Sequence, residues 1–81
     1  MSKENIEVVF RKLKYFLDKS LPVHFTEEDG TWHNGNLKDL VIEEALVVLI
    51  DIMPGRGMKI IPAESIIPDS IVEYIKKEEK R

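Results

Sequence analysis

Apolar residues recur at helical spacing over the first part of the chain, from residue 3 to residue 19. Charged residues fill most of the positions between them, Ser2 is placed to cap the helix, and Pro22 marks its exit. The pattern predicts an amphipathic helix whose apolar face packs against the rest of the domain, with binding of a partner as the alternative. The apolar positions are Ile6, Val9, Phe10, Leu13, Phe16 and Leu17.

After this segment the period of the pattern changes from helical spacing to two. Apolar and polar residues alternate over residues 23–26, and Asp29-Gly30 then supplies a strong signal for a two-residue hairpin turn. We therefore expect a strand before the turn and a second strand over residues 31–40. Gly35 lies inside the second strand, where a strongly curved strand needs room for its neighbours.

Three further short strands are expected. Residues 45–53 are almost continuously apolar and predict a strand that is buried on both faces or in a subunit contact. Residues 54–57 form a turn, residues 58–61 a fourth strand, and residues 65–67 a possible fifth. Short strands separated by regular turn signals favour a small β-barrel over residues 21–67.

The last segment, residues 68–81, is predicted to form a short helix with a frayed, charged end. Ser70 and Glu73 have the spacing of a capping box, and apolar residues at 71, 72 and 75 share a helical face. A strand is the alternative, because Ile71, Val72 and Tyr74 are good strand formers. Together the elements predict one mainly β domain over residues 1–81, with a helix at each end.

The composition indicates the cellular compartment in which the protein is expected. The 81 residues include no cysteine, which excludes disulfides and thiolate metal sites and fits a reducing compartment. Residues 1–5 have no signal-peptide character, and the longest apolar run, residues 45–50, is too short to span a membrane. We expect a soluble, cytoplasmic protein with no membrane partner. A chain this short has a thin stability margin, which oligomerisation would improve.

The order of helix, hairpin, glycine-containing strand and Arg-Gly turn resembles the Sm and Sm-like proteins. The first Sm motif is matched by Val23-His24-Phe25, Asp29-Gly30, Gly35-Asn36-Leu37 and Leu40, and the second by Arg56-Gly57-Met58-Lys59-Ile60. The resemblance implies a strongly bent five-stranded barrel whose edges pair between subunits to form a ring. Many members of the family bind single-stranded RNA.

Two observations disfavour RNA as the ligand. Where uridine-binding members of the family have their base-contacting residues, this chain has Leu40-Val41 and Ala45-Leu46. Residues 21–67 carry three basic and eight acidic side chains, a net charge of −5, whereas nucleic-acid affinity depends on neutralising phosphates. The positive excess lies in the first helix. Arg56 is the RNA-contact residue that the resemblance carries over, and a solvated loop charge is the simpler interpretation of it.

The remaining candidate binding residues are Trp32, His33, Gly57 and Lys59. Trp32 follows the hairpin turn, where it either packs at the end of the barrel or stacks against a ligand or partner. With a two-residue turn, His24 and His33 lie on the same face of the hairpin, but two ligands do not make a metal site, and none is predicted.

The sequence contains no nucleophile elbow, phosphate loop or spaced metal-ligand cluster, so no catalytic residue and no cofactor is assigned. The prediction is a non-catalytic, Sm-like binding module that forms homo-oligomers and presents a surface to a protein partner. The alternative is an RNA-binding protein that uses Arg56 and the basic first helix. An enzyme with a site between subunits is the third hypothesis.

Overall fold

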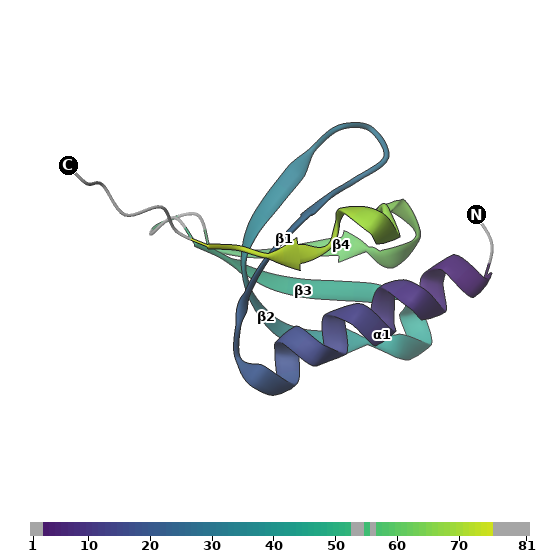
Figure 1. Ribbon diagram of the computed structural model, residues 1–81, viewed down its shortest axis with the longest axis horizontal. Helices are drawn as coiled ribbons and strands as arrows, with labels where there is room; N and C mark the ends of the chain where they lie inside the picture. Colours follow the sequence, from purple (N-terminus) through teal and green to yellow (C-terminus); the bar gives the residue numbers. More distant parts are fainter. Residues whose placement is uncertain (1–2, 53–54, 56, 76–81) are drawn as a thin grey trace.

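The computed structural model describes residues 3–52, 55 and 57–75, which form one helix and one five-stranded antiparallel sheet (Figure 1). The elements in chain order are α1 (Lys3–Lys19), β1 (Pro22–Thr26), β2 (Trp32–Val41), η1 (Ile42–Glu44), β3 (Leu46–Asp51), β4 (Met58–Pro62), η2 (Ala63–Ser65), η3 (Pro68–Ser70) and β5 (Val72–Glu73), where η denotes a 3-10 turn. The predicted N-terminal helix and mainly β character are confirmed.

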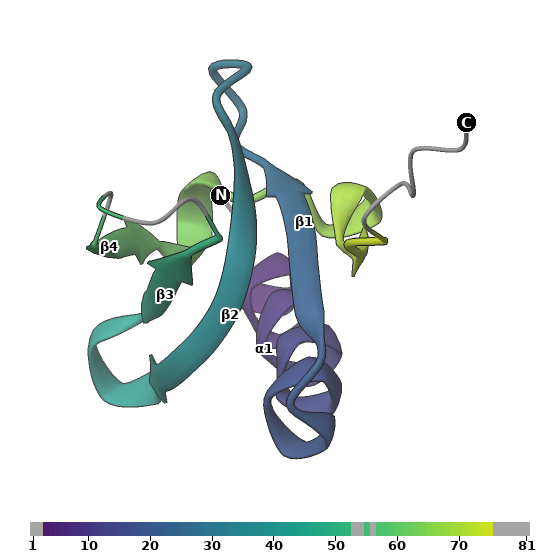
Figure 2. The same cartoon turned by 90° about the vertical axis from the view of Figure 1, so that its left-hand side faces the viewer.

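The strands lie in the order β4-β3-β2-β1-β5, so that β4 and β5 are the two edges. β2 is the longest strand and curves through the middle of the sheet, with β3 and β4 on one side and β1 on the other (Figure 2). Within the described residues no pairing joins β4 to β5. The domain is therefore an open, curved sheet, and the sheet includes β5, which lies beyond the predicted barrel boundary at residue 67.

The helix α1 covers one face of the sheet, called here the inner face. Its apolar residues Val9, Phe10 and Leu13 are buried, as the helical spacing predicted. The residues that complete the core are Val23, Phe25, Val47, Leu49, Ile61, Ala63, Ile66 and Ile71. Burial of one large apolar side chain stabilises the fold by roughly 1.5–3 kcal/mol. In the described part of the chain, no helix is both long and apolar enough to cross a membrane.

The opposite face of the sheet, called here the outer face, is exposed. On β3 the side chains alternate, because Val47 and Leu49 are buried whereas Ile50 is 43% exposed. The prediction that residues 45–53 form a strand buried on both faces is therefore wrong within this single chain; residue 53 lies outside the described residues. The alternation arises because α1 covers only the inner face.

Strand β2 bends because of two local features. The register with β3 shifts between Leu37 and Asp39, so Lys38 is an extra residue that forms a bulge. Gly35 lies opposite Asp51, and a Cβ at this position would overlap the carbonyl oxygen of Ile50. The predicted need for room at Gly35 is confirmed, and the crowding comes from the backbone of β3.

The first hairpin turn is one residue longer than predicted. Pairing ends at Thr26 and Trp32, the Glu27 N–H donates to the Thr31 carbonyl (2.7 Å), and the Gly30 N–H donates to the Glu27 carbonyl (2.9 Å). Residues 28–30 thus form the loop, with Gly30 at a φ of +95° that favours glycine.

The longer loop shifts the register by one residue, and a shift of one residue moves side chains to the opposite face. His24 is paired with Asn34, and Phe25 is paired with His33. The prediction that His24 and His33 share a face is therefore wrong.

The C-terminal helix predicted for residues 68–81 is absent from residues 68–75. Pro68–Ser70 forms a 3-10 turn, and Val72–Glu73 forms β5, which pairs with β1. The strand alternative prevails because Ile71 is buried in the core and the Tyr74 N–H donates to the Pro22 carbonyl at 3.0 Å. Residues 76–81 lie outside the described residues. The possible strand at 65–67 is reduced to one bridge, between Glu27 and Ile66.

Replacing Gly35 by valine should lower the free energy of unfolding by more than about 2 kcal/mol, because a branched side chain cannot fit beside the Ile50 carbonyl. Thermal or urea denaturation measures the change. Asn36→Val is the matched control, since Asn36 is the next residue and is exposed. Equal stability of the two variants would show that β2 does not need glycine at its bend.

Candidate binding cleft and buried polar network

A cleft of about 510 Å³ opens between the β1–β2 hairpin, the end of β3 and the end of β5. It is lined by Gly30, Thr31, Trp32, Asn34, Asp51, Ile52, Lys59 and Tyr74. This volume lies within the range of roughly 300–1,000 Å³ that is common for ligand sites. The cleft therefore has room for a small ligand or a short peptide segment.

Strand pairing places four of the cleft residues on the outer face, namely Trp32, Asn34, Ile52 and Tyr74. Asp51 is paired with Gly35 and Lys59 with Leu49, so these two belong to the inner face. Residues directly opposite each other in antiparallel strands point to the same face. His24 is paired with Asn34, and the Ile52 N–H donates to the Asn34 carbonyl at 3.1 Å, which places Ile52 in the same row. Tyr74 joins them from the end of β5. The row thus spans the edge strand β5 and the three strands β1, β2 and β3.

Trp32 and Asn34 are held by contacts with His24. The indole of Trp32 is 62% exposed, and its ring centroid lies 6.3 Å from that of His24. The His24 Nδ1–H donates to Asn34 Oδ1 at 2.5 Å. Because this bond uses the amide oxygen, the amide nitrogen of Asn34 keeps its two hydrogens for other acceptors.

Among the described residues, the cleft lining carries one basic and one acidic side chain, Lys59 and Asp51. Lys59 pairs with Asp51 at 3.2 Å, and the Asp51 side chain is only 11% exposed. Glu28 and Asp29 are exposed in the hairpin loop beside Gly30 and Thr31. The single basic side chain of the lining is therefore already opposed by a carboxylate.

Asp29 also stabilises the hairpin loop. The Thr31 N–H donates to Asp29 Oδ1 at 2.9 Å, and this bond lowers the pKa of Asp29 below its ordinary value of 3.8. A lowered pKa means that the carboxylate contributes stability above the ordinary pKa and that this contribution is lost as the pH falls through the lowered one. The loop therefore keeps this negative charge at neutral pH.

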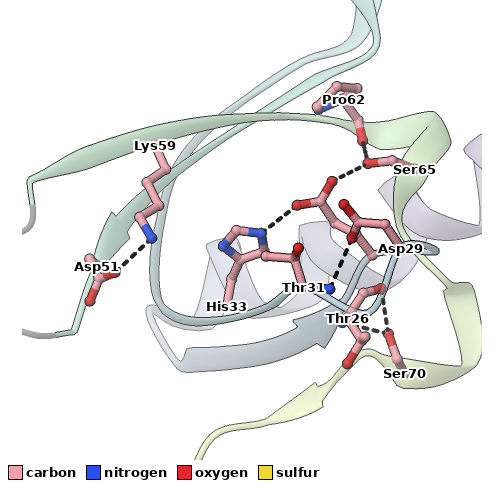
Figure 3. A network of polar contacts seen from close by, with 10 residues as sticks. Thr26, Asp29, Thr31, His33, Asp51, Lys59, Pro62, Ser65 and Ser70 are labelled. Carbon is pink, nitrogen blue, oxygen red and sulfur yellow. Dashed lines mark hydrogen bonds and ion pairs between the residues drawn. The ribbon is translucent and has the colours of Figure 1, made fainter.

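A second cluster of polar side chains lies on the inner face, beneath the hairpin, where His33 is buried and Glu27 and Ser65 are partly buried (Figure 3). Glu27 accepts a hydrogen bond from His33 Nε2 at 2.6 Å and another from Ser65 Oγ at 2.8 Å. His33 is 7% exposed, and its Nδ1 has no hydrogen-bond partner among the described residues. We call Glu27, His33 and Ser65 the buried polar network.

The network links the hairpin to the segment after β4. Ser65 lies in η2, and its carbonyl accepts a hydrogen bond from the Glu28 N–H at 2.8 Å. The serine and the histidine both bond to the carboxylate rather than to each other, so they do not form a serine–histidine nucleophile pair. This arrangement gives the partly buried carboxylate of Glu27 two hydrogen-bond partners.

The candidate binding residues predicted from the sequence lie in different places in the structure. Trp32 and Lys59 line the cleft, whereas His33 belongs to the buried polar network and does not line it. Gly57 is exposed in the turn before β4, with a φ of +77°, and does not line the cleft. Arg56 lies outside the described residues. In the part of the chain that the structure describes, no group of three or more histidine and carboxylate side chains could hold a metal ion.

Sequence reasoning missed several residues of the cleft and the network, namely Asn34, Ile52, Tyr74, Glu27 and Ser65. Their grouping depends on the hairpin register and on the pairing of β5 with β1. One signal was available: the strand alternative for residues 69–76, which rests on good strand formers such as Ile71 and Val72, places Tyr74 on the sheet.

Glu27→Ala should destabilise the fold by about 1–3 kcal/mol, because it leaves the buried His33 without a hydrogen-bond partner, whereas Ser65 Oγ keeps the Pro62 carbonyl as an acceptor. Glu28→Ala is the neighbouring control, since the Glu28 side chain is exposed and only its backbone bonds to Ser65. Urea denaturation compares the two variants. If both lose the same stability, the buried polar network does not hold the hairpin in place.

Comparisons of this chain with protein-family models, with curated proteins and with solved structures give no match. The cleft, the network and the edges of the sheet are therefore the basis for the functional inference.

Proposed function

We propose that the chain is a non-catalytic binding module that assembles with copies of itself. The β4 edge of one copy pairs with the β5 edge of the next. The observation that carries this proposal is that both edges of the sheet present unpaired backbone groups beside exposed apolar side chains. Unprotected edges of this kind promote pairing with another chain.

Hydrogen-bond alternation identifies the free groups of β4. The Asp51 N–H donates to the Gly57 carbonyl at 3.0 Å, and the Ala63 N–H donates to the Ala45 carbonyl at 2.8 Å. Every second residue between Gly57 and Ala63 therefore bonds to β3. The backbone N–H and C=O groups of Met58 and Ile60 point away from the sheet.

The same alternation applies to the short strand β5. The Tyr74 N–H donates to the Pro22 carbonyl, and Val72 is paired with His24 on β1. Glu73, between them, therefore directs its backbone groups to the free edge. Val72 and Ile75 are exposed beside it, so this edge also combines free backbone groups with apolar side chains.

Apolar side chains on the outer face support assembly over a monomer. Met58 is 56% exposed and Ile60 is 60% exposed, and Ile50, opposite Met58, is exposed as well. Soluble monomers rarely expose contiguous apolar patches of large area, and larger ones mark interaction sites. Pairing through β4 would cover these residues. The resemblance to the Sm and Sm-like proteins supports a closed ring as the form of the assembly.

A second candidate function is RNA binding through Arg56 and the outer surface of α1. Arg11, Lys14 and Lys19 are exposed along this surface. Lys12 is engaged elsewhere, because its Nζ donates to the Pro68 carbonyl at 3.1 Å. The net charge of −5 over residues 21–67 opposes this function.

Ile60→Pro should convert the oligomer to a monomer, because proline removes an N–H that faces the free edge and leaves the bonds to β3 in place. Light scattering coupled to size-exclusion chromatography measures the mass. Ile60→Thr is the matched control, since threonine keeps both the N–H and a branched side chain. A parent protein that is monomeric at micromolar concentration would refute self-assembly.

For RNA binding, fluorescence anisotropy with oligo-uridine and oligo-adenine over a series of salt concentrations gives the test. We expect weak binding without base preference, and we expect Arg56→Ala to change the free energy of unfolding by no more than about 0.5 kcal/mol. Tight, salt-sensitive binding that prefers uridine and is weakened by Arg56→Ala would instead establish the RNA-binding function.

A further inference from the structure

We infer that the assembly proposed above joins β4 of one copy to β5 of the next as parallel strands, in a register that places Lys59 opposite Glu73 of the second copy. The inference rests on the proposed self-assembly and specifies its strand direction, its register and an ion pair between copies. Three features support it: the free backbone groups of the two edges, the direction of the edge strands, and the side chains that the edges carry.

The free backbone groups of the two edges fit a parallel ladder. On β4, Met58 and Ile60 direct their backbone groups away from β3, and on β5 Glu73 directs its groups away from β1. In a parallel pair, a residue that faces the neighbouring strand bonds to the two residues on either side of the one opposite it. The Glu73 N–H would therefore donate to the Met58 carbonyl, and the Ile60 N–H would donate to the Glu73 carbonyl.

Other arrangements of the same two edges fit less well. In an antiparallel pair, residues that exchange both bonds lie directly opposite each other and point to the same face. Glu73 would then share a face with Met58 and Ile60, which are 56% and 60% exposed on the outer face, so its carboxylate would lie among apolar side chains. A parallel register further along β4 would need an N–H from Pro62, which has none.

The topology of the sheet favours the same strand direction. Four antiparallel pairings separate β4 from β5, so the two edge strands run in the same direction within one copy. Where a second copy continues the sheet with its inner face on the same side, its β5 lies parallel to the β4 that it joins. Each further copy can be added in the same way, as a closed ring requires.

The side chains of the two strands are complementary in this register. The segments Met58-Lys59-Ile60 and Val72-Glu73-Tyr74 each have a charged residue between two apolar or aromatic ones. Lys59 and Glu73 both lie on the inner face, because their partners on β3 and β1 are buried core residues. Pairing the central residues places the opposite charges side by side on the inner face and brings the flanking side chains together on the outer face. The charge complementarity identifies a second copy as the partner.

Lys59 can bind a carboxylate of its own chain and Glu73 of the second copy at the same time. Its Nζ lies 3.2 Å from Asp51 Oδ2, and its side chain is 34% exposed (Figure 3). An ammonium group has three donors, so the contact with Asp51 leaves donors for a second carboxylate. Glu73 is exposed at the edge of β5, where it is accessible to a lysine of another copy.

Exchange of the two charges tests the ion pair. Glu73→Lys should raise the apparent dissociation constant of the oligomer by at least about tenfold, because two lysines then lie opposite each other between copies. The double variant Lys59→Glu/Glu73→Lys restores opposite charges and should recover the parent mass. Light scattering coupled to size-exclusion chromatography over a series of protein concentrations measures both. Glu7→Lys is the matched control, since it makes the same change of charge at an exposed position of α1.

Cross-linking gives a second test that keeps Lys59 and its contact with Asp51, and the chain has no native cysteine. In the parallel register Met58 lies opposite Val72 of the second copy, so Met58→Cys/Val72→Cys should form a disulfide between copies on mild oxidation. Met58→Cys/Tyr74→Cys is the matched control, because its two positions are offset along the strands and lie too far apart for a disulfide. Electrophoresis without reducing agent separates cross-linked from free chains, and circular dichroism checks that each variant is folded.

The outcomes distinguish failure of this inference from failure of the proposed function. A parent protein that is monomeric would refute self-assembly, and the inference with it. An oligomeric parent would leave self-assembly in place, and two results would then overturn the parallel register. One is a Glu73→Lys variant that dissociates no more than Glu7→Lys does, and the other is cross-linking that favours the control pair over Met58→Cys/Val72→Cys.

Discussion

The pairing of Thr26 with Trp32 determines which side chains of β1 and β2 reach the core and which reach solvent. In this register Phe25 and His33 point inward, whereas His24 and Asn34 point outward. A shift by one residue would place Phe25 and Trp32 on the same face of the hairpin, so that either Trp32 would be buried or Phe25 would be exposed. The core and the cleft therefore depend on the same hairpin, and the three-residue loop that ends in Gly30 sets its register.

The buried polar network reinforces this register from the inner face. Glu27 stands where the strand becomes the loop, and its carboxylate reaches both His33 and Ser65. Backbone bonds run beside it, from the Glu28 N–H to the Ser65 carbonyl and from the Ile67 N–H to the Thr26 carbonyl (3.0 Å). A half-satisfied polar group costs more in a low-dielectric interior than in water, so alternative registers that separate these partners are disfavoured.

The sequence predicted the elements whose signal is local. The helix over residues 3–19 follows from apolar spacing alone, and the crowding at Gly35 follows from a glycine within a curved strand. The hairpin register depends on whether the loop has two or three residues, and the Asp29-Gly30 signal does not specify the loop length. For the last segment a helix was preferred over a strand, because Ser70 and Glu73 have the spacing of a helix cap. Strand β5 is instead stabilised by pairing with β1, which is distant in the sequence.

The candidate site could be predicted only in part for the same reason. Trp32 and Lys59 stood out by residue type, but the partners that make them a cleft come from strand pairing across β5, β1, β2 and β3. His33 stood out equally and proved to be buried, since residue type does not reveal the face on which a strand residue lies.

Helix α1 covers the inner face, so the proposed assembly uses parts of the sheet that α1 leaves exposed, and Lys59 of β4 lies both on the assembly strand and in the cleft lining. Because α1 covers the inner face, the sheet can contact other molecules through its outer face or its edges, and α1 presents an exposed surface of its own. Met58 and Ile60 of β4 lie at one edge, where free backbone groups favour pairing with another strand. The cleft lies between the β1–β2 hairpin and Tyr74. There, side chains supply both the apolar surface and the hydrogen-bond donors. In the proposed assembly, pairing at the edges uses backbone groups, whereas the cleft presents side chains, so the two surfaces differ in the groups that they offer to another molecule.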